Sequence, residues 1–241
     1  MTSPIIITGA AQRLGLAIAE NLLAQHHDVI ITYRSEKPAV EKLISRGAVA
    51  IQADFATNEG IQRFISTLTN DQTLDLANKK VRAIIHNASD WDQESDTNDY
   101  ASLFTKMMQV HASAPYQINM ALKKLFVDKK VGADIIHMTD FVQEKGSKKH
   151  IAYAASKAAL HNLTLSFSAL LAPNVKVNSL APALVMFNEW DSVEYKEKAL
   201  KKSLLEICPG AQEAVKAVNF LLNSDYVTGQ TMHLNGGRHL K

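Results

Sequence analysis

The sequence predicts a doubly wound α/β protein with one parallel sheet and helices on both of its faces. Short β-branched runs such as residues 5–7 and 29–33 recur along the chain, and stretches with helical apolar spacing separate them. Strands that alternate with helices are typical of parallel sheets. The first strand also leads through a glycine-containing turn into a helix. With 241 residues and no internal repeat, we expect a single domain over residues 1–241.

The expected elements follow in chain order. Strands are predicted over residues 5–7, 29–33, 48–53, 81–85, 133–138, 175–180 and 230–234. Helices are predicted over residues 14–25, 39–45, 57–68, 100–127 with an interruption at Ala114-Pro115, 151–172 and 212–222. Residues 70–80 and 142–150 are predicted loops, and residues 186–206 form a partly helical insertion with Trp190, a candidate lid.

Composition and charge narrow the classes of function. The formal net charge is +2 and the basic residues are scattered, so we expect neither nucleic acid nor an anionic membrane as partner. No apolar run approaches the ~18 residues of a membrane span, and the N-terminal apolar stretch is too short for a signal peptide. The one cysteine, Cys208, allows no internal disulfide. We therefore expect a soluble protein of the reducing cytoplasm.

Tyr153 and Lys157 are candidate catalytic residues. They lie four residues apart in a predicted helix, so their side chains share a face, one turn apart. A free phenol and a Lys ammonium titrate near ~10 and ~10.4 and exchange protons poorly at neutral pH. An ammonium beside the phenol favours the phenolate, so we expect a lowered pKa for Tyr153. Such pairs also occur on ordinary surface helices, so other motifs have to support this one.

The turn after the first strand has the features of a phosphate site. It contains Gly9 and Gly15, and the backbone N–H groups at the start of the next helix bind phosphate well. Arg13 stands where the usual three-glycine pattern has its middle glycine. A cation at this point opposes the helix dipole. We therefore interpret Arg13 as a ligand of a phosphate or of the substrate, with an exposed surface Arg as the alternative.

Arg34 and Ser35 follow the second strand, at the position that selects between nicotinamide cofactors. An acidic residue there binds the ribose 2′-hydroxyl of NAD, whereas an Arg accommodates the 2′-phosphate of NADP. Asp28 lies at the opposite end of this strand. The sequence therefore favours NADPH over NADH, with an ordinary solvent-exposed Arg as the alternative.

Several motifs in a fixed order give the chain a family resemblance. They are Thr8-Gly9 with Gly15, Asp54, Asn87-Ala88, Tyr153 with Lys157, Val177-Asn178-Ser179 with Pro182, and Thr228-Gly229 with Asn235-Gly236-Gly237. Together they resemble the short-chain dehydrogenase/reductase family over almost the whole chain. The resemblance implies a Rossmann fold, hydride transfer from a nicotinamide cofactor and a homotetramer. It also implies that Tyr153 donates a proton, that Lys157 binds the nicotinamide ribose and tunes Tyr153, and that Asp54 faces the adenine.

Two positions depart from the pattern of that family. The family usually has a Ser thirteen positions before the Tyr, where this chain has Asp140, and an Asn on the long fourth helix, where His111 stands. A carboxylate would repel the alkoxide that develops when a ketone is reduced. Reduction of a C=N bond instead passes through a cationic imine, which Asp140 can stabilise or help to protonate. Asp140 therefore favours imine reduction, and the alternative is a catalytic Ser that has been lost.

Asp140, Arg13 and Trp91 together resemble the pteridine reductase branch of the family. There, an aromatic at the position of Trp91 stacks on the pterin, and the Arg of the turn reaches cofactor phosphate and substrate. Residues 86–89, 137–140, 150–160 and 236–240 resemble the branch members that reduce 7,8-dihydromonapterin with NADPH, and dihydrofolate more weakly. The resemblance implies NADPH-dependent reduction of the C=N bond of a dihydropterin.

The expected site follows from these observations. The catalytic set is Tyr153, Lys157 and Asp140, and the substrate set is Arg13, Trp91, Asp140 and Tyr153. The cofactor set is Gly9, Arg13, Leu14, Gly15, Arg34, Ser35, Asp54, Phe55, Asn87, Ala88, Ser89, Tyr153, Lys157 and Pro182. No histidine shows paired ligand spacing, so no metal site is expected. Two alternatives stay open: a ketone reductase acting on ketoacyl or sugar-alcohol substrates, and a non-catalytic NADPH-binding sensor.

Overall fold

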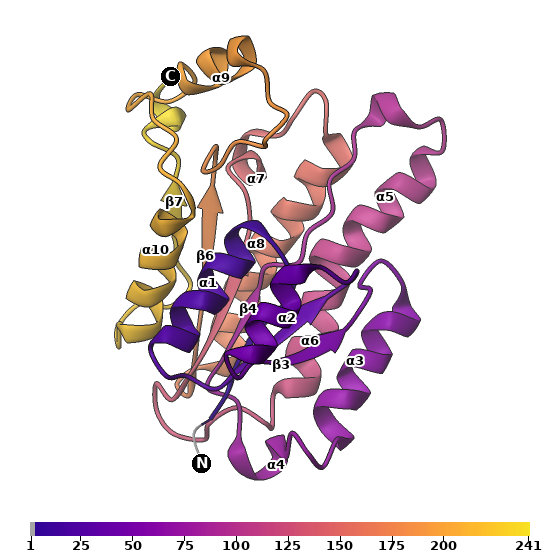
Figure 1. Cartoon of the computed structure of the whole chain (residues 1–241), viewed down its shortest axis with the longest axis vertical. Coiled ribbons are helices and arrows are strands. Elements are labelled where there is room, and N and C mark those ends of the chain that lie inside the picture. The colour runs from indigo at the N-terminus through magenta and orange to yellow at the C-terminus, as the bar shows by residue number, and fades with distance from the viewer. Residues whose placement is uncertain (1–2) are drawn as a thin grey trace.

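A computed structural model describes residues 3–241 and contains one seven-stranded sheet (Figure 1). Its strands run in the order β3-β2-β1-β4-β5-β6-β7, and all neighbouring pairs are parallel. The strands are β1 (Ile5–Ile7), β2 (Val29–Tyr33), β3 (Val49–Gln52), β4 (Ala83–His86), β5 (Ala133–Met138), β6 (Val175–Pro182) and β7 (Thr231–Leu234). The order reverses between β1 and β4, and open sheets of this kind bind ligands at the carboxyl ends of the strands beside the reversal.

Helices cover both faces of the sheet. They are α1 (Arg13–Ala24), α2 (Pro38–Ser45), α3 (Asn58–Asn70), α4 (Leu76–Lys79), α5 (Tyr100–Met108), α6 (Ala114–Leu122), α7 (Val142–Lys145), α8 (Ile151–Leu171), α9 (Val193–Leu200) and α10 (Ala211–Asn223). Helices α1, α2 and α10 pack on one face, and α3, α6 and α8 pack on the other. Within residues 3–241, no helix has the length and apolar character needed to cross a membrane.

The pleat of β1 shows why the strands are apolar throughout. Ile5 and Ile7 belong to the core cluster with α1 and α10, whereas Ile6 belongs to the opposite cluster with Phe64 and Phe167. All three isoleucines are at most 1% exposed. A strand that is covered on both faces has no solvent side, so a continuous β-branched run is its expected sequence. The doubly wound arrangement predicted from the sequence is confirmed.

Two predicted loops contain short helices. The strands predicted over 29–33 and 133–138 match β2 and β5 at both ends, but α4 forms within residues 70–80 and α7 within residues 142–150. Each of these helices has four residues, which is too short for a helical repeat to show in the sequence. The Asp140 carboxylate stabilises α7 because it accepts the Val142 N–H at 2.9 Å.

The helix predicted over 100–127 is interrupted near Pro115, as expected, and ends at Leu122 rather than at residue 127. The interruption is a π-helical turn, Gln109–Ser113, that joins α5 to α6. Pro115 has no N–H to bond to the preceding turn, so the backbone there can widen. The wider turn carries His111 into the interior, where it is 1% exposed.

A row of four buried polar side chains links β4 and β5 to α6 and α8. His86 Nε2 lies 2.7 Å from Asn119 Oδ1, Asn119 Nδ2 lies 3.1 Å from His137 Nε2, and His137 Nδ1 lies 2.8 Å from Thr164 Oγ1. Thr164 donates to the Leu160 carbonyl, so it accepts the proton of His137 Nδ1, and this fixes one direction for the whole row. Both imidazoles are neutral, since burial lowers the pKa of His86 to about 4 and the pKa of His137 well below 6.5.

We expect this row to make the protein sensitive to acid. An unfolded His titrates near ~6.5, whereas folded His86 takes up its proton only near pH 4. The unfolded chain therefore binds more protons below pH 6.5. The free energy of unfolding should fall between about pH 6.5 and about pH 4, by roughly 3 kcal/mol for His86 alone. Urea unfolding measured across this range checks the slope. The variant His86→Gln keeps a side-chain N–H for Asn119 and should show a shallower slope, and an equal slope would exclude His86 as a cause.

Candidate active site

Tyr153, Asp140 and Lys157 meet at the carboxyl end of β5. The Tyr153 hydroxyl donates to Asp140 Oδ2 at 3.0 Å, and Lys157 Nζ donates to the Met138 carbonyl at 2.9 Å. The Lys157 ammonium lies 5.5 Å from the centre of the Tyr153 ring. The one-turn spacing on α8 and the end of β5 thus bring together the three residues that the sequence predicts to be catalytic.

Burial controls the protonation of this cluster. It raises the pKa of the Tyr153 hydroxyl well above 10, and the charge of Asp140 raises this pKa further. The predicted lowering of the Tyr153 pKa is therefore wrong in this structure, because the group beside the hydroxyl is an acid and Lys157 faces the ring. Burial also raises the pKa of Asp140 and lowers the pKa of Lys157 to about 8. Both members of the Tyr153–Asp140 pair therefore favour their protonated forms more than they would in water.

His111 supports Tyr153 from within the π-helical turn. The two rings meet edge-on, with 5.3 Å between their centres. The Asp90 N–H donates to His111 Nε2 at 3.2 Å, so Nδ1 carries the proton and donates to Ser156 Oγ at 2.8 Å. Ser156 donates in turn to the Tyr153 carbonyl at 2.7 Å, and Ser89 Oγ lies 2.8 Å from Nε2. A neutral His111, whose pKa is lowered by burial, thus joins the loop after β4 to α8.

The turn between β1 and α1 is held by the end of β4. Asn87 Nδ2 donates to the carbonyls of Thr8 and Gly9 at 3.1 and 2.8 Å, and Thr8 Oγ1 accepts the N–H groups of Asn87 and Ala88, each at 3.0 Å. Gly9 has a φ of +69°, and a Cβ on it would lie 2.7 Å from Ala88 Cα. A Cβ on Gly15 would lie 2.5 Å from the Asn87 amide. Close packing therefore requires both glycines, and Asn87 is a structural link.

The start of α1 can receive an anion. Gln12 precedes the helix, and no side chain within residues 3–241 caps its N-terminus. The first turn contains Arg13, Leu14 and Gly15 and has no acidic residue. Backbone N–H groups that no side chain occupies at a helix start favour phosphate binding. This end of α1 can therefore hold the pyrophosphate of a dinucleotide, and its binding there stays a prediction.

Arg13 contacts the insertion that follows β6. Its guanidinium donates to Asn188 Oδ1 at 2.6 Å and to the Met186 carbonyl at 3.3 Å. The backbone at Arg13 has a φ of +54°, which is strained for a residue with a side chain. Such a conformation persists only where surrounding contacts impose it. The structure therefore places the Arg13 side chain between the β1–α1 turn and the insertion, in contact with residues 186–188.

Arg34 forms an ion pair between the ends of β2 and β4. Its guanidinium lies 2.8 Å from Asp90 Oδ2, and the same oxygen lies 3.1 Å from Lys106 Nζ. Burial would raise the pKa of Asp90, but the hydrogen bonds from Arg34 and Lys106 outweigh it and lower this pKa. Asp90 Oδ1 also accepts the Trp91 N–H at 3.2 Å. The Arg34 side chain is 57% exposed, so it is accessible at the position predicted for a cofactor phosphate.

Trp91 presents an exposed aromatic surface. Trp91 is 59% exposed, and its ring packs at a tilt against His150, with 4.4 Å between the ring centres and 35° between the ring planes. His150 Nδ1 is hydrogen-bonded to the Asp92 carbonyl at 3.3 Å. An indole that is supported on one face by a second ring can stack on a flat ligand with its other face. This placement fits the stacking predicted for Trp91.

The remaining predicted cofactor residues differ in their surroundings. Asp54 Oδ1 accepts the Ala56 N–H at 3.0 Å beyond the end of β3. Phe55 is 6% exposed and packs edge-on against Phe64, with 5.4 Å between the ring centres. The Phe55 side chain belongs to the core, so only its backbone can face a ligand. Sequence reasoning could not separate these two neighbours, because it placed both at a strand end without showing which side chain turns inward.

Other predicted residues lie at strand ends. Ser35 is exposed beyond β2, and Pro182 is the last residue of β6. Trp190 is 82% exposed in the insertion. Figure 1 shows α9, which belongs to the same insertion, at the carboxyl end of β6 and close to the C-terminus. The lid suggested for this segment stays a prediction.

Four further residues support the site and were not predicted from the sequence. Asp90, His150 and Ser156 make the contacts described above, and Glu94 Oε1 accepts the Ala152 N–H at 2.8 Å, at the start of α8. A carboxylate at a helix N-terminus stabilises the helix, so Glu94 helps to fix the helix that carries Tyr153. The hydrogen bonds of Asp90 and Ser156 to His111, of His150 to the Asp92 carbonyl and of Glu94 to Ala152 span 21 to 58 positions in the chain. Asp90 and Glu94 belong to the acidic segment 90–96, whereas His150 and Ser156 have no comparable signal in the sequence.

The chain is similar to known reductases over its whole length. A family model described as enoyl-(acyl carrier protein) reductase matches residues 9–239. Dihydromonapterin reductase of Enterobacter sp. (strain 638) is 50% identical over 238 residues, which cover 98% of this chain and 97% of that protein. Dihydromonapterin reductase of Escherichia coli (strain K12) is 48% identical over 239 residues, which cover 99% of this chain and 97% of that protein.

Solved structures share the same fold. FolM alternative dihydrofolate reductase 1 from Brucella canis, complexed with NADP, matches with a TM-score of 0.84 and 25% identity, over 99% of this chain and 95% of that chain. Its counterpart from Brucella suis, also in complex with NADP, matches with a TM-score of 0.85 and 25% identity, over 99% of this chain and 96% of that chain. The insertion after β6 and the C-terminal segment thus fall within the region shared with NADP-binding reductases.

Proposed function

The chain belongs to the short-chain dehydrogenase/reductase family, and we propose that it reduces the C=N bond of a dihydropterin with NADPH. We propose 7,8-dihydromonapterin as its preferred substrate and dihydrofolate as a weaker one. The observation that carries this proposal is the 3.0 Å hydrogen bond from the Tyr153 hydroxyl to Asp140. An acid at this position opposes the oxyanion of ketone reduction and suits a nitrogen that has to be protonated. The names of the relatives and the NADP in the solved structures support the same conclusion.

The catalytic cluster supplies the proton that this reaction consumes. When bound, NADPH supplies a hydride, which C6 of the dihydropterin accepts. N5 takes up a proton from the Tyr153 hydroxyl, or from water held by Asp140, and burial raises the pKa of both groups. Lys157 has a pKa of about 8 and is therefore charged at neutral pH. Its ammonium stabilises the negative charge left on the pair and holds the nicotinamide ribose.

The substrate and cofactor contacts follow from the placement of the other residues. We propose that the pterin stacks on the free face of Trp91 and that Arg13, at the edge of the insertion, contacts both pterin and phosphate. The pyrophosphate binds at the start of α1, and Asp54 faces the adenine. The 2′-phosphate binds to the exposed guanidinium of Arg34, and Ser35 is the next residue in the chain.

We expect Arg34→Ala to reduce the preference for NADPH over NADH by about 10- to 100-fold in kcat/KM. The reason is the loss of a charge-assisted hydrogen bond to the 2′-phosphate, which contributes about 1.5–3 kcal/mol. Initial rates with each cofactor at a saturating pterin concentration measure the ratio. Arg46→Ala is a matched control, because Arg46 lies at the end of α2 and pairs with Glu20. An unchanged ratio in Arg34→Ala would remove the main support for NADPH.

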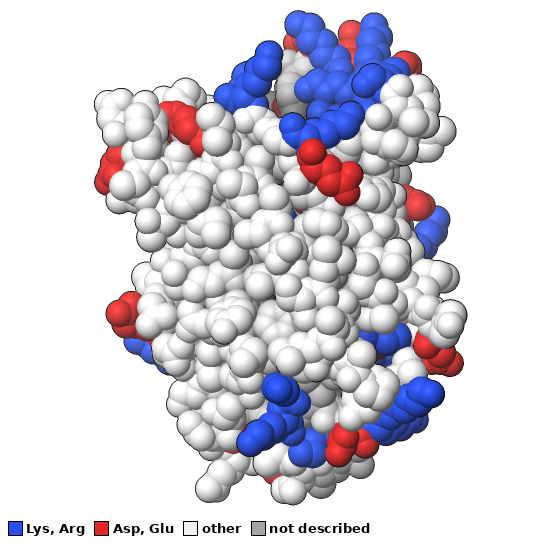
Figure 2. All heavy atoms as spheres, turned by 180° about the vertical axis from the view of Figure 1, so that it is seen from behind, with Lys and Arg blue, Asp and Glu red and all other residues white. Residues whose placement is uncertain are grey.

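We also propose that the protein is a cytoplasmic homotetramer. Helices α5, α6 and α8 enclose an open groove of about 780 Å³ that is lined entirely by uncharged side chains. Phe104 and Tyr116 in this groove are each 49% exposed. Figure 2 shows a broad face with few charged side chains across its middle. Exposed aromatic side chains such as these two are typical of contacts between subunits, and a second copy of the chain would cover them.

NADPH consumption with three substrates in parallel tests the proposed function. The substrates are 7,8-dihydromonapterin, 7,8-dihydrofolate and a ketoacyl thioester. We expect turnover of both pterins, with dihydromonapterin the fastest. Turnover of the thioester alone would contradict the proposal and identify a ketone reductase. Binding of NADPH without turnover of any substrate would identify a sensor.

A further inference from the structure

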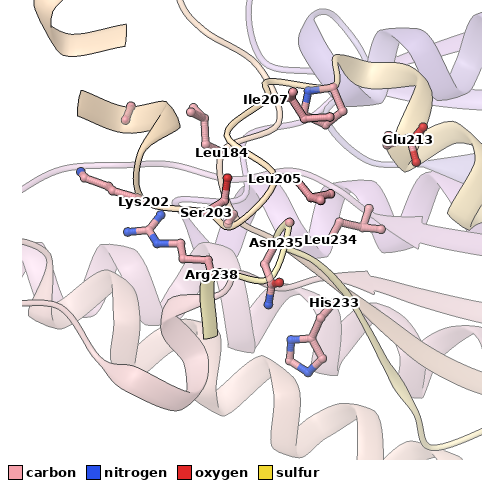
Figure 3. A pocket seen from close by; sticks show the side chains of 14 residues that line it. Leu184, Lys202, Ser203, Leu205, Ile207, Glu213, His233, Leu234, Asn235 and Arg238 are labelled. Atoms are coloured by element: carbon pink, nitrogen blue, oxygen red, sulfur yellow. The ribbon is translucent and has the colours of Figure 1, made fainter. Parts of the chain in front are cut away.

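A second cavity lies at the ends of β6 and β7. It has a volume of about 390 Å³, within the range of roughly 300–1,000 Å³ for small-molecule sites. Its apolar wall includes Leu184, Leu205 and Leu234, and its polar side includes Lys202 and Arg238 (Figure 3). The proposed pterin contacts do not use any of these residues. The cavity combines an apolar wall with two cations, which suits an amphipathic anion.

The walls of this cavity are tied together by the backbone. The Gly236 carbonyl accepts the N–H groups of Leu204 and Leu205 at 2.8 and 3.1 Å, so the C-terminal segment is joined to the loop after α9. Lys241 Nζ adds a bond to the Ser203 carbonyl at 2.9 Å. The cavity is therefore part of the ordered architecture around the end of β7.

The cations of this cavity are free to bind an anion. Within residues 3–241, the guanidinium of Arg238 has no hydrogen-bonded acceptor, and its Cζ lies 4.8 Å above the centre of the Phe141 ring. Lys202 also has no acidic partner among the described residues. The one carboxylate in the lining, Glu213, is paired with Lys216 at 2.7 Å. Figure 3 shows Lys202 and Arg238 on the same side of the cavity.

The cavity adjoins the catalytic residues through two short segments. Phe141, whose ring packs against the Arg238 guanidinium, directly follows Asp140. The Phe141 N–H donates to the Pro182 carbonyl at 3.0 Å. Ala183 and Leu184 follow Pro182 directly and line the cavity. The positive charge of Arg238 also acts on Asp140, where it lowers the pKa against the larger effect of burial. A ligand at the end of β5 can therefore extend towards this cavity along the ends of β5 and β6.

We infer that this cavity binds the tail of an extended dihydropterin, an aromatic amide that ends in carboxylates, as in dihydrofolate. The inference rests on the proposed function, and it adds a binding site for the tails of dihydropterins that end in carboxylates. The leucines pack against the aromatic ring of the tail, and Arg238 and Lys202 bind its carboxylates. Arg238 can form a bidentate pair with a carboxylate. The polyol side chain of dihydromonapterin has neither an aromatic ring nor a charge, so this cavity adds little to its binding.

The test compares two substrates in three variants. In Arg238→Gln and in Lys202→Gln, the ratio of kcat/KM for dihydromonapterin to kcat/KM for dihydrofolate should increase about tenfold, mainly through the KM for dihydrofolate. Lys201→Gln is the matched control, because Lys201 neighbours Lys202 in sequence but does not line the cavity, and its ratio should not change. A ratio that stays within about twofold in both cavity variants would overturn the inference.

A binding measurement separates this inference from the proposed function. Titration calorimetry of the protein with p-aminobenzoyl-glutamate, the isolated tail, should give binding that is about tenfold weaker in Arg238→Gln. If no pterin is turned over but the tail still binds with this dependence, the proposed function fails and the cavity site stands. If pterins are turned over and the tail binds equally to all variants, the cavity site fails alone.

Discussion

Replacing Tyr153 with Phe is expected to lower kcat by about 10²- to 10⁴-fold, which is the usual contribution of a general acid. The ring itself should stay in place, because its edge-on contact with His111 and the burial of α8 do not involve the hydroxyl. The variant loses only the group that donates to Asp140 at 3.0 Å. Single-turnover kinetics with NADPH and dihydromonapterin measure the chemical step, and fluorescence titration measures NADPH affinity, which should change by less than about threefold.

The control for this change is Tyr116→Phe on α6, where the Tyr is 49% exposed and lies outside the catalytic cluster. Its kcat should match that of the unmodified protein. If Tyr153→Phe retains more than about a tenth of kcat, the proton reaches N5 by another route, through water held by Asp140. A joint loss of turnover and NADPH affinity would point to damage to the fold instead.

Replacing Asp140 with Asn should lower pterin turnover by about 100-fold, since the amide has nearly the same shape but cannot supply a proton. The N–H of Val142 keeps an acceptor in this variant, so α7 should be retained. The pH dependence gives a second measurement. In the unmodified protein, burial raises the pKa of Asp140, so the rate should decrease as the pH rises through this raised value and the acid loses its proton.

In Asp140→Asn, the decrease in rate at the pKa of Asp140 should disappear. Only the decrease in rate due to loss of the Tyr153 proton should remain. The Tyr153 pKa should itself move down, because the charge of Asp140 is one of the causes that raise it. The variant Asp140→Ser tests the charge hypothesis directly, since it restores the residue usual in the family. If Asp140→Ser reduced the pterin as fast as the unmodified protein, the preference for imine chemistry would not depend on the acid.

The sequence predicts the fold well because its signals are local. The runs at β1 and β2 are short and β-branched, and a strand buried on both faces allows little else. The same holds for Tyr153 and Lys157, whose spacing alone fixes their common face on α8. Asp140 is placed correctly because it directly follows β5, and the ends of parallel strands gather at one edge of the sheet.

The parts of the site that escape sequence reasoning depend on contacts between distant segments. Arg34 could be placed at the end of β2, but its pairing with Asp90 could not, because the two residues are 56 positions apart. The pKa of Tyr153 was predicted with the wrong sign for the same reason. Spacing shows that Lys157 is near, whereas the dominant effects are burial and the carboxylate of Asp140, which only the folded chain reveals.

The link from Asn87 to Thr8 and Gly9 has a consequence for synthesis of the protein. The groups that shape the β1–α1 turn come from the end of β4, so a nascent chain that stops before β4 cannot complete the turn. β1 also lacks one of its two neighbours until then, since it pairs with both β2 and β4. A dinucleotide can stabilise only conformations that already contain its site. A cofactor that binds at the β1–α1 turn can therefore contribute to folding only after β4 has docked.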